Sequence, residues 1–163
     1  VPHKGINAIY RMAPVMAGIE EFAKTLGRHK HPLLGSPTIS VGKIGGGAAV
    51  NVVPDSCAID IDMRLLPEMD GAAAMREVGA FLRKRGAKDF VMEKPFLVDF
   101  SLEQDAGDPL VKLVQQVTKE QKSRSKLLGA PYGTDGSKMK RVGVPTLACI
   151  VSLTAVTTSA RWP

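Results

Sequence analysis

Cysteine and aromatic residues are both scarce in this chain. Phenylalanine, tryptophan and tyrosine make up 5% of its 163 residues, too few for the stacked aromatic platform that single-stranded nucleic acid uses. The two cysteines, Cys57 and Cys149, lie in separate apolar runs, so we expect small buried thiols in a reducing compartment rather than a disulfide. No CxxC or mixed cysteine–histidine spacing is present, which excludes zinc-finger patterns.

Long hydrophobic runs are also absent. No segment approaches the roughly 20 apolar residues that cross a bilayer, and no basic-then-apolar signal peptide opens the chain. We therefore expect a cytoplasmic protein with no membrane partner. The hydrophobic content of 44% and charged content of 23% are ordinary for a globular protein. Because Val1 is not an initiator methionine, we expect a piece of a longer protein.

The net charge of +6 permits nucleic-acid binding without favouring it. The charges are dispersed, apart from one basic run at Lys119–Lys126, which we interpret as a solvated helix end. A basic nucleic-acid binder is therefore the least favoured alternative, and we expect no nucleic-acid partner.

Hydrophobic spacing predicts five elements in the first part of the chain. They are a helix over Asn7–Leu26, strands over Thr38–Ile44 and Cys57–Leu66, a helix over Gly71–Arg85 and a strand over Phe90–Val98. Asn7 and Asp70 are the expected N-caps, whereas Pro14 predicts a kink or a later helix start. One further strand before Val1 would complete βαββαβ, so we expect an α+β fold, the ferredoxin-like sandwich.

The second part of the chain has a weaker pattern. The acidic segment Asp99–Asp108 has no periodicity and marks a domain boundary, which divides the chain into residues 1–98 and 99–163. A helix over Pro109–Lys122, a loop over Gly129–Lys138 and a strand over Val144–Val151 are expected after it. No GxSxG elbow or nucleotide-binding glycine motif is present.

Polar side chains on the predicted strands suggest two readings. Asn51 and Arg64 could hold a carboxylate, which arginine can bind through two hydrogen bonds. From spacing alone, surface pairing of Arg64 with Asp60 and Asp62 is favoured. His29 and His31 are expected to be surface residues rather than a metal clip.

Three stretches together resemble one family. They are PHKGINAI at residues 2–9, VGKIGGGAAVNVVPDSCAIDIDMRLLP at residues 41–67 and GTDGSKMKRVGVPTL at residues 133–147. The resemblance is to the zinc-dependent aminoacylases and carboxypeptidases, which include acetylornithine deacetylase, succinyl-diaminopimelate desuccinylase and glutamate carboxypeptidase. It implies a ferredoxin-like lid that forms a homodimer, followed by an α/β remnant of the catalytic domain.

The resemblance also implies roles for particular residues. Asn51 and Arg64 match the pair that recognises the substrate carboxylate, in some members across the dimer interface, and this reverses the preference for surface pairing. Gly133, Thr134 and Asp135 match a loop that lines the substrate pocket. The implied substrate is a small N-acyl amino acid or peptide, cleaved by water that zinc (or cobalt) activates in the full-length enzymes.

The departures from the family pattern concern the metal. The HxD motif, the bridging aspartate and the paired glutamates of the family are absent from this sequence. We therefore expect no catalytic residue, no metal ligand and no cofactor in this chain alone, and a fragment that is inactive. The alternative is a non-catalytic dimerisation or binding module. After Ile150 the match stops, and the tail is expected to be aberrant.

Overall fold

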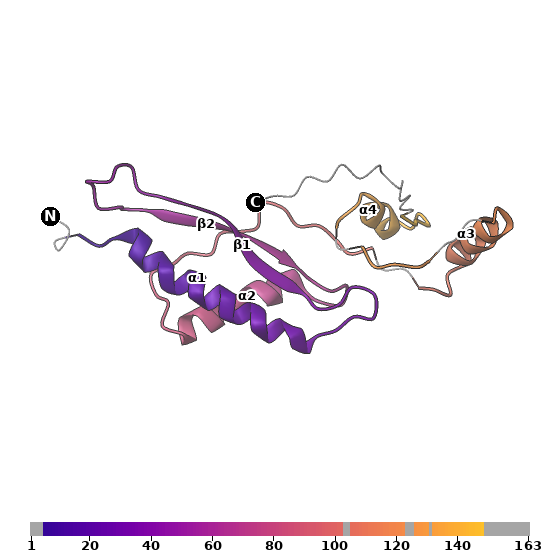
Figure 1. Cartoon of the computed structure of the whole chain (residues 1–163), viewed down its shortest axis with the longest axis horizontal. Coiled ribbons are helices and arrows are strands. Elements are labelled where there is room, and N and C mark those ends of the chain that lie inside the picture. The colour runs from indigo at the N-terminus through magenta and orange to yellow at the C-terminus, as the bar shows by residue number, and fades with distance from the viewer. Residues whose placement is uncertain (1–4, 103–104, 123–125, 131, 149–163) are drawn as a thin grey trace, which may run out of the picture.

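The computed structural model describes residues 5–102, 105–122, 126–130 and 132–148. The elements in chain order are α1 (Ala8–Thr25), the 3-10 turn η2 (Leu26–Arg28), β1 (Thr38–Gly46), β2 (Cys57–Arg64), α2 (Gly71–Lys84), α3 (Pro109–Glu120) and α4 (Gly136–Arg141). Helices α3 and α4 lie at the end of the molecule away from the turn that joins β1 to β2 (Figure 1). The mixed content confirms the α+β class, and the order helix, strand, strand, helix is the expected one.

Helix α1 begins where its expected cap places it. The Asn7 side chain accepts a hydrogen bond from the Tyr10 amide at 3.2 Å, and the Ala8 amide donates to the Pro54 carbonyl at 2.9 Å. The later start that Pro14 suggested is wrong, because the helix runs through this residue. Pro14 is exposed, so water can satisfy the carbonyl group that proline leaves without a donor.

No helix of the described residues has the length and apolar character of a membrane span.

Strands β1 and β2 form an antiparallel hairpin with one irregularity. The register changes between Val41 and Lys43, which leaves Gly42 as an extra residue on β1. A regular strand would place Ile44 on the face opposite Val41. The bulge returns it to the same face, where three apolar pairs follow one another: Ile39 with Met63, Val41 with Ile61, and Ile44 with Ile59.

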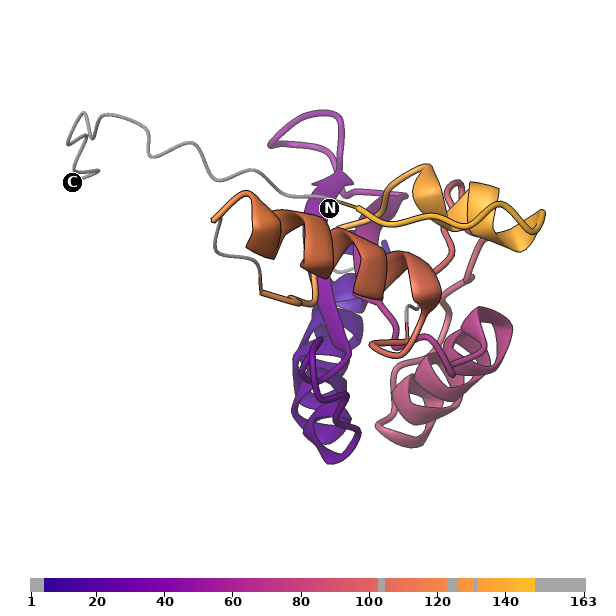
Figure 2. The same cartoon turned by 90° about the vertical axis from the view of Figure 1, so that its right-hand side faces the viewer.

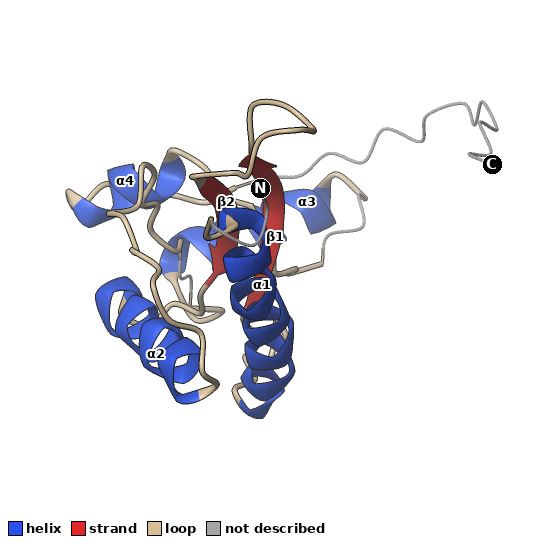
Figure 3. Cartoon of the chain, turned by 90° about the vertical axis from the view of Figure 1, so that its left-hand side faces the viewer, coloured by secondary structure: helices blue, strands red, loops and turns tan. Residues whose placement is uncertain are grey.

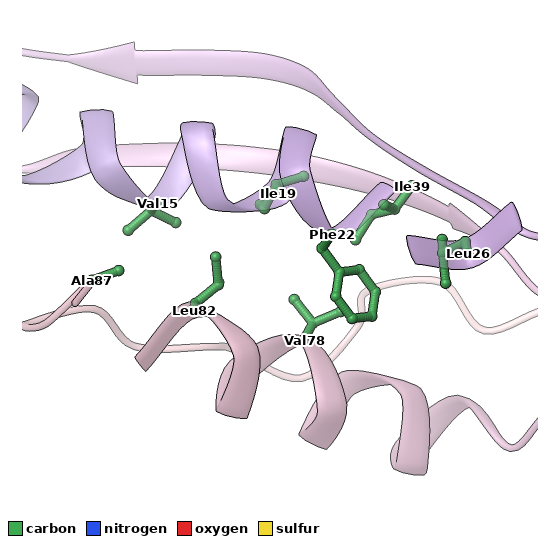
Figure 4. Packing of buried hydrophobic residues seen from close by; sticks show 8 residues of the cluster. All are labelled: Val15, Ile19, Phe22, Leu26, Ile39, Val78, Leu82 and Ala87. Atoms are coloured by element: carbon green, nitrogen blue, oxygen red, sulfur yellow. The ribbon is translucent and has the colours of Figure 1, made fainter. Parts of the chain in front are cut away.

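The core lies between α1, α2 and this apolar face of the hairpin. Figure 4 shows the side chains that meet there, namely Val15, Ile19, Phe22, Leu26, Ile39, Val78, Leu82 and Ala87. The Phe22 and Phe81 rings pack edge to face with centroids 5.3 Å apart. Gly18 lies under Leu82, and its lack of a side chain allows α1 and α2 to approach closely.

The strand expected over Phe90–Val98 is wrong. This segment has no regular secondary structure, and the described strands are confined to the β1–β2 hairpin (Figure 3). Val91 and Phe96 are each 89% exposed, and Pro95 has no amide hydrogen to donate. A strand requires a neighbouring strand for its hydrogen bonds, and no described segment pairs with this one.

In the second part of the chain, the described residues form helices and loops. As expected, Asp108 caps α3, since its Oδ1 accepts from the Leu110 amide at 2.8 Å. The loop expected over Gly129–Lys138 ends earlier, because α4 begins at Gly136.

The strand expected over Val144–Val151 is wrong in its described part, because no strand forms over residues 144–148. Cys149 and the tail after Ile150 lie outside the described residues. Figure 2 shows α3 and α4 from the end of the molecule that they occupy.

Candidate substrate-recognition site

Arg64 is the last residue of β2, opposite Thr38. Its Nε donates a hydrogen bond to Oδ2 of Asp62 at 2.8 Å, and both side chains are more than half exposed. The surface pairing expected from the strand pattern is therefore present. The hydrogen bond to Asp62 uses Nε of the guanidinium. The terminal edge, formed by Nη1 and Nη2, has the geometry to bind a ligand carboxylate.

Asn51 lies in the exposed turn that joins β1 to β2. Gly47 turns the chain at the start of this segment with φ of +78°, and the Val52 amide donates to the Ala49 carbonyl at 3.1 Å. The turn is at one end of the hairpin and Arg64 is at the other. Strand β2 between them spans roughly 24 Å at about 3.4 Å per residue. Asn51 and Arg64 of one chain therefore cannot hold the same carboxylate.

The loop Gly133–Asp135 leads directly into α4. The Thr134 carbonyl accepts from the Ser137 hydroxyl at 2.9 Å and from the Ser137 amide at 3.2 Å, and Ser137 is 1% exposed. The carboxylate of Asp135 accepts from Nζ of Lys138 at 2.8 Å. This hydrogen bond and the charge of Lys138 lower the pKa of Asp135, and the same carboxylate raises the pKa of Lys138.

Asp99 is a residue of this region that sequence patterns did not indicate. Its Oδ1 is 3.5 Å from the Ser137 hydroxyl, and its Oδ2 lies against Gly133, where a side chain would overlap it. The guanidinium of Arg141 lies 3.8 Å from the centroid of the Phe100 ring. These contacts fix the loop and α4 against residues 99–100. Asp99 and Ser137 are 38 residues apart in sequence, so no local period could reveal their contact.

The structure brings only part of the expected site together. Gly133, Thr134 and Asp135 are adjacent and supported by Asp99. The turn that carries Asn51 lies at the end of the molecule opposite α4 (Figure 1).

The described residues do not fit a zinc centre. They contain no group of three or more histidine, cysteine, aspartate or glutamate side chains that could hold a metal ion. Nδ1 of His31 accepts hydrogen bonds from the Leu33 and Leu34 amides at 3.2 Å each, so this nitrogen serves a turn. Asp62 is paired with Arg64. No step of a reaction can be assigned to a metal on these residues.

Comparison with known proteins decides the family. Residues 1–89 match the family model of the peptidase dimerisation domain. The chain belongs to this family. The dimerisation domain as matched contains α1, β1, β2 and α2, the elements that share the buried core.

Similar proteins of known sequence or structure are much longer than this chain. The uncharacterised protein YgeY of Escherichia coli K12 is 34% identical over 80 residues, which are 48% of this chain and 19% of that protein. A tripeptidase from Staphylococcus aureus superimposes with a TM-score of 0.62 at 20% identity, covering 88% of this chain and 37% of the other. An M20 family metallo-carboxypeptidase from Sulfolobus solfataricus gives 0.51 at 17%, covering 83% and 39%. At these identities the two structures show the fold alone.

Proposed function

We propose that this chain supplies the dimerisation and carboxylate-recognition part of a metal-dependent hydrolase. The observation that supports it is the match of residues 1–89 to the peptidase dimerisation domain, with the hairpin and both helices of that region in place. In this proposal residues 1–98 form the lid and residues 99–163 belong to the catalytic domain. The metal, zinc or cobalt, is held by parts of the full-length protein that this sequence does not contain.

The homodimer forms through the lid. The outer edges of β1 and β2 make no backbone hydrogen bond to another described segment, and edge strands with free amide and carbonyl groups can pair with a second chain. The outward face of the hairpin is polar, with Lys43 of β1 opposite Asp60 of β2. Burying these exposed charges would be unfavourable. We therefore expect the two chains to pair along a strand edge and not across this face.

Substrate recognition in this proposal uses residues from both chains. Arg64 binds the carboxylate of a small N-acyl amino acid or peptide through the free edge of its guanidinium, and Gly133–Asp135 lines the pocket. Asn51 is too far along the hairpin to join its own Arg64, which supports the arrangement in which it serves the partner's site. The cytoplasm is the expected location of this hydrolysis.

Sedimentation equilibrium of the chain at micromolar concentrations tests the proposed association. We expect the mass of a dimer. A monomer across the full concentration range would contradict assembly through the lid of this chain.

Activity and zinc measurements test whether this chain is one part of a hydrolase or a complete enzyme. We expect no turnover of N-acetyl amino acids by the chain in zinc-containing buffer, and no stoichiometric zinc by elemental analysis. Turnover together with one or two bound zinc ions would overturn the assignment of the metal ligands to other parts of the protein. A dimer without turnover agrees with the proposal and also with a non-catalytic module. Carboxylate binding at Arg64 distinguishes these two.

A further inference from the structure

A shallow cavity of about 410 Å³, broadly open to solvent, lies beside α2, within the dimerisation domain and outside the residues proposed for substrate recognition. It is lined by Met75, Arg76, Gly79, Arg83 and Met92. The first four residues come from α2, and Met92 comes from the segment that follows the helix and returns along it. Cavities that bind small ligands or side chains are typically about 300–1,000 Å³, so this one has room for a bound group.

The shape of the cavity depends on Gly79. This residue is buried, and a methyl group at its position would lie 2.9 Å from Sδ of Met92 and 3.1 Å from Nη1 of Arg83. The thioether and the guanidinium therefore both lie against the bare helix backbone. Arg83 is also held over the Phe90 ring at 5.1 Å, which fixes its guanidinium at the cavity wall.

The walls combine positive charge with adaptable apolar surface. Arg76 and Arg83 are two helical turns apart on α2, and among the described residues neither forms an ion pair. Arg85, just outside the cavity, pairs with Glu21 instead. Met75 and Met92 are half-buried, and methionine side chains adjust their shape to varied apolar partners.

We propose that this cavity binds an acidic peptide segment in which an apolar side chain lies between two carboxylates. The methionines contact the apolar side chain, and the two guanidinium groups hydrogen-bond the carboxylates. Charge complementarity identifies the partner, because two exposed arginines that form no ion pair among the described residues line the cavity together with two methionines. The net charge of +6 on the chain attracts such a peptide over a longer range.

Fluorescence anisotropy of a labelled peptide with the core sequence Glu-Leu-Glu, added to the full chain, tests the proposal. We expect saturable binding that weakens at high salt. A peptide with Lys-Leu-Lys should not bind, and one with Glu-Ser-Glu should bind more weakly because the methionines lose their apolar partner. Absence of saturable Glu-Leu-Glu binding, or equal affinity for Glu-Ser-Glu, would overturn the proposal.

Matched variants locate the binding on the protein. Arg76→Gln and Arg83→Gln should each weaken binding about tenfold, the ratio that corresponds to 1.4 kcal/mol. Lys84→Gln and Lys88→Gln remove the same charge outside the cavity and should bind as the unchanged chain does. Arg76→Lys keeps the charge but loses the planar guanidinium, so intermediate affinity is expected.

Equal loss of binding in Lys84→Gln and Lys88→Gln would assign binding to diffuse positive charge and contradict the cavity. Competition by an oligonucleotide with equal affinity would contradict it too. Circular dichroism checks that each variant is folded.

Discussion

Arg64 and Asp62 lie two residues apart on the same face of β2, and Nε of the arginine donates to Oδ2 of the aspartate at 2.8 Å. The bond orients the guanidinium rather than stabilising the fold, because both side chains are more than half exposed. An oriented arginine loses less conformational freedom when it binds a carboxylate, so Asp62 is expected to assist ligand binding through Arg64.

Arg64→Gln should therefore separate binding from stability. We expect the free energy of unfolding to change by less than about 1 kcal/mol, as for other exposed ion pairs. Binding of N-acetylalanine, followed by NMR chemical shifts, should be lost. Arg28→Gln, which removes a positive charge from η2 rather than from β2, serves as the control and should leave the shifts of the ligand unchanged. Equal binding by both variants would contradict the role of Arg64.

The packing of α1 on α2 depends on the missing side chain of Gly18. A methyl group there would lie 2.5 Å from Cδ2 of Leu82, so Gly18→Val overpacks the core. We expect a loss of about 1–3 kcal/mol in the free energy of unfolding, measured by urea denaturation. Gly27→Ala is the matched control, because nothing lies within 4 Å of that position. It should be neutral or stabilising by up to about 1 kcal/mol, since alanine restricts the unfolded chain. Equal destabilisation by both would refute close packing at Gly18.

The start of α2 depends on Asp70. Its Oδ1 accepts a hydrogen bond from the Ala73 amide at 2.6 Å and satisfies one of the free amides of the first turn. Asp70→Ala should lower the free energy of unfolding by about 0.5–2 kcal/mol, whereas Asp70→Asn, which keeps an oxygen acceptor, should lower it by less. Thermal unfolding compares the two variants. An asparagine variant as unstable as the alanine variant would show that the cap contributes through its charge alone.

The pair Asp135–Lys138 gives a prediction about pH. The hydrogen bond from Lys138 lowers the pKa of Asp135 below its ordinary value of 3.8, and Asp135 raises the pKa of Lys138 above 10.5. The contribution of the depressed carboxyl is present above pH 3.8 and is lost as the pH falls through the lower, folded-state pKa. The contribution of the raised amine is fully present below pH 10.5 and is lost as the pH rises through the folded-state pKa.

NMR titration of the Asp135 carboxyl carbon measures this coupling. In Lys138→Gln the pKa of Asp135 should return toward 3.8. In Lys140→Gln, a charge change on the same short helix, it should stay low. A midpoint for Asp135 that does not respond to Lys138→Gln would show that the two side chains do not interact in solution.

The elements that could be predicted from sequence are those with local causes. The spacing of apolar residues located α1 and α2, and the side chains of Asn7, Asp70 and Asp108 located three helix starts. These signals depend on residues within one or two turns. The expected strand over Phe90–Val98 fails for the opposite reason, because a strand depends on a neighbour that the local sequence does not specify.

The candidate site shows the same distinction. The family resemblance selected Asn51, Arg64 and Gly133–Asp135, and the predicted strand over Cys57–Leu66 already separated Asn51 from Arg64 along the chain. Asp99 was missed because its contact with Ser137 joins residues 38 positions apart. Helix α4 was missed because six residues are too few to establish a helical period.

The bulge at Gly42 has a consequence for how this hairpin tolerates insertions and deletions. Removing Gly42 would leave Lys43 opposite Asp60 and Ile44 opposite Ile59, since the bulged residue has no partner of its own. A one-residue deletion within β2 would instead invert every side chain beyond it. Homologous hairpins can therefore lose a residue at this point of β1 and keep the same face toward the helices. A gap at Gly42 in a sequence alignment would not indicate a different fold.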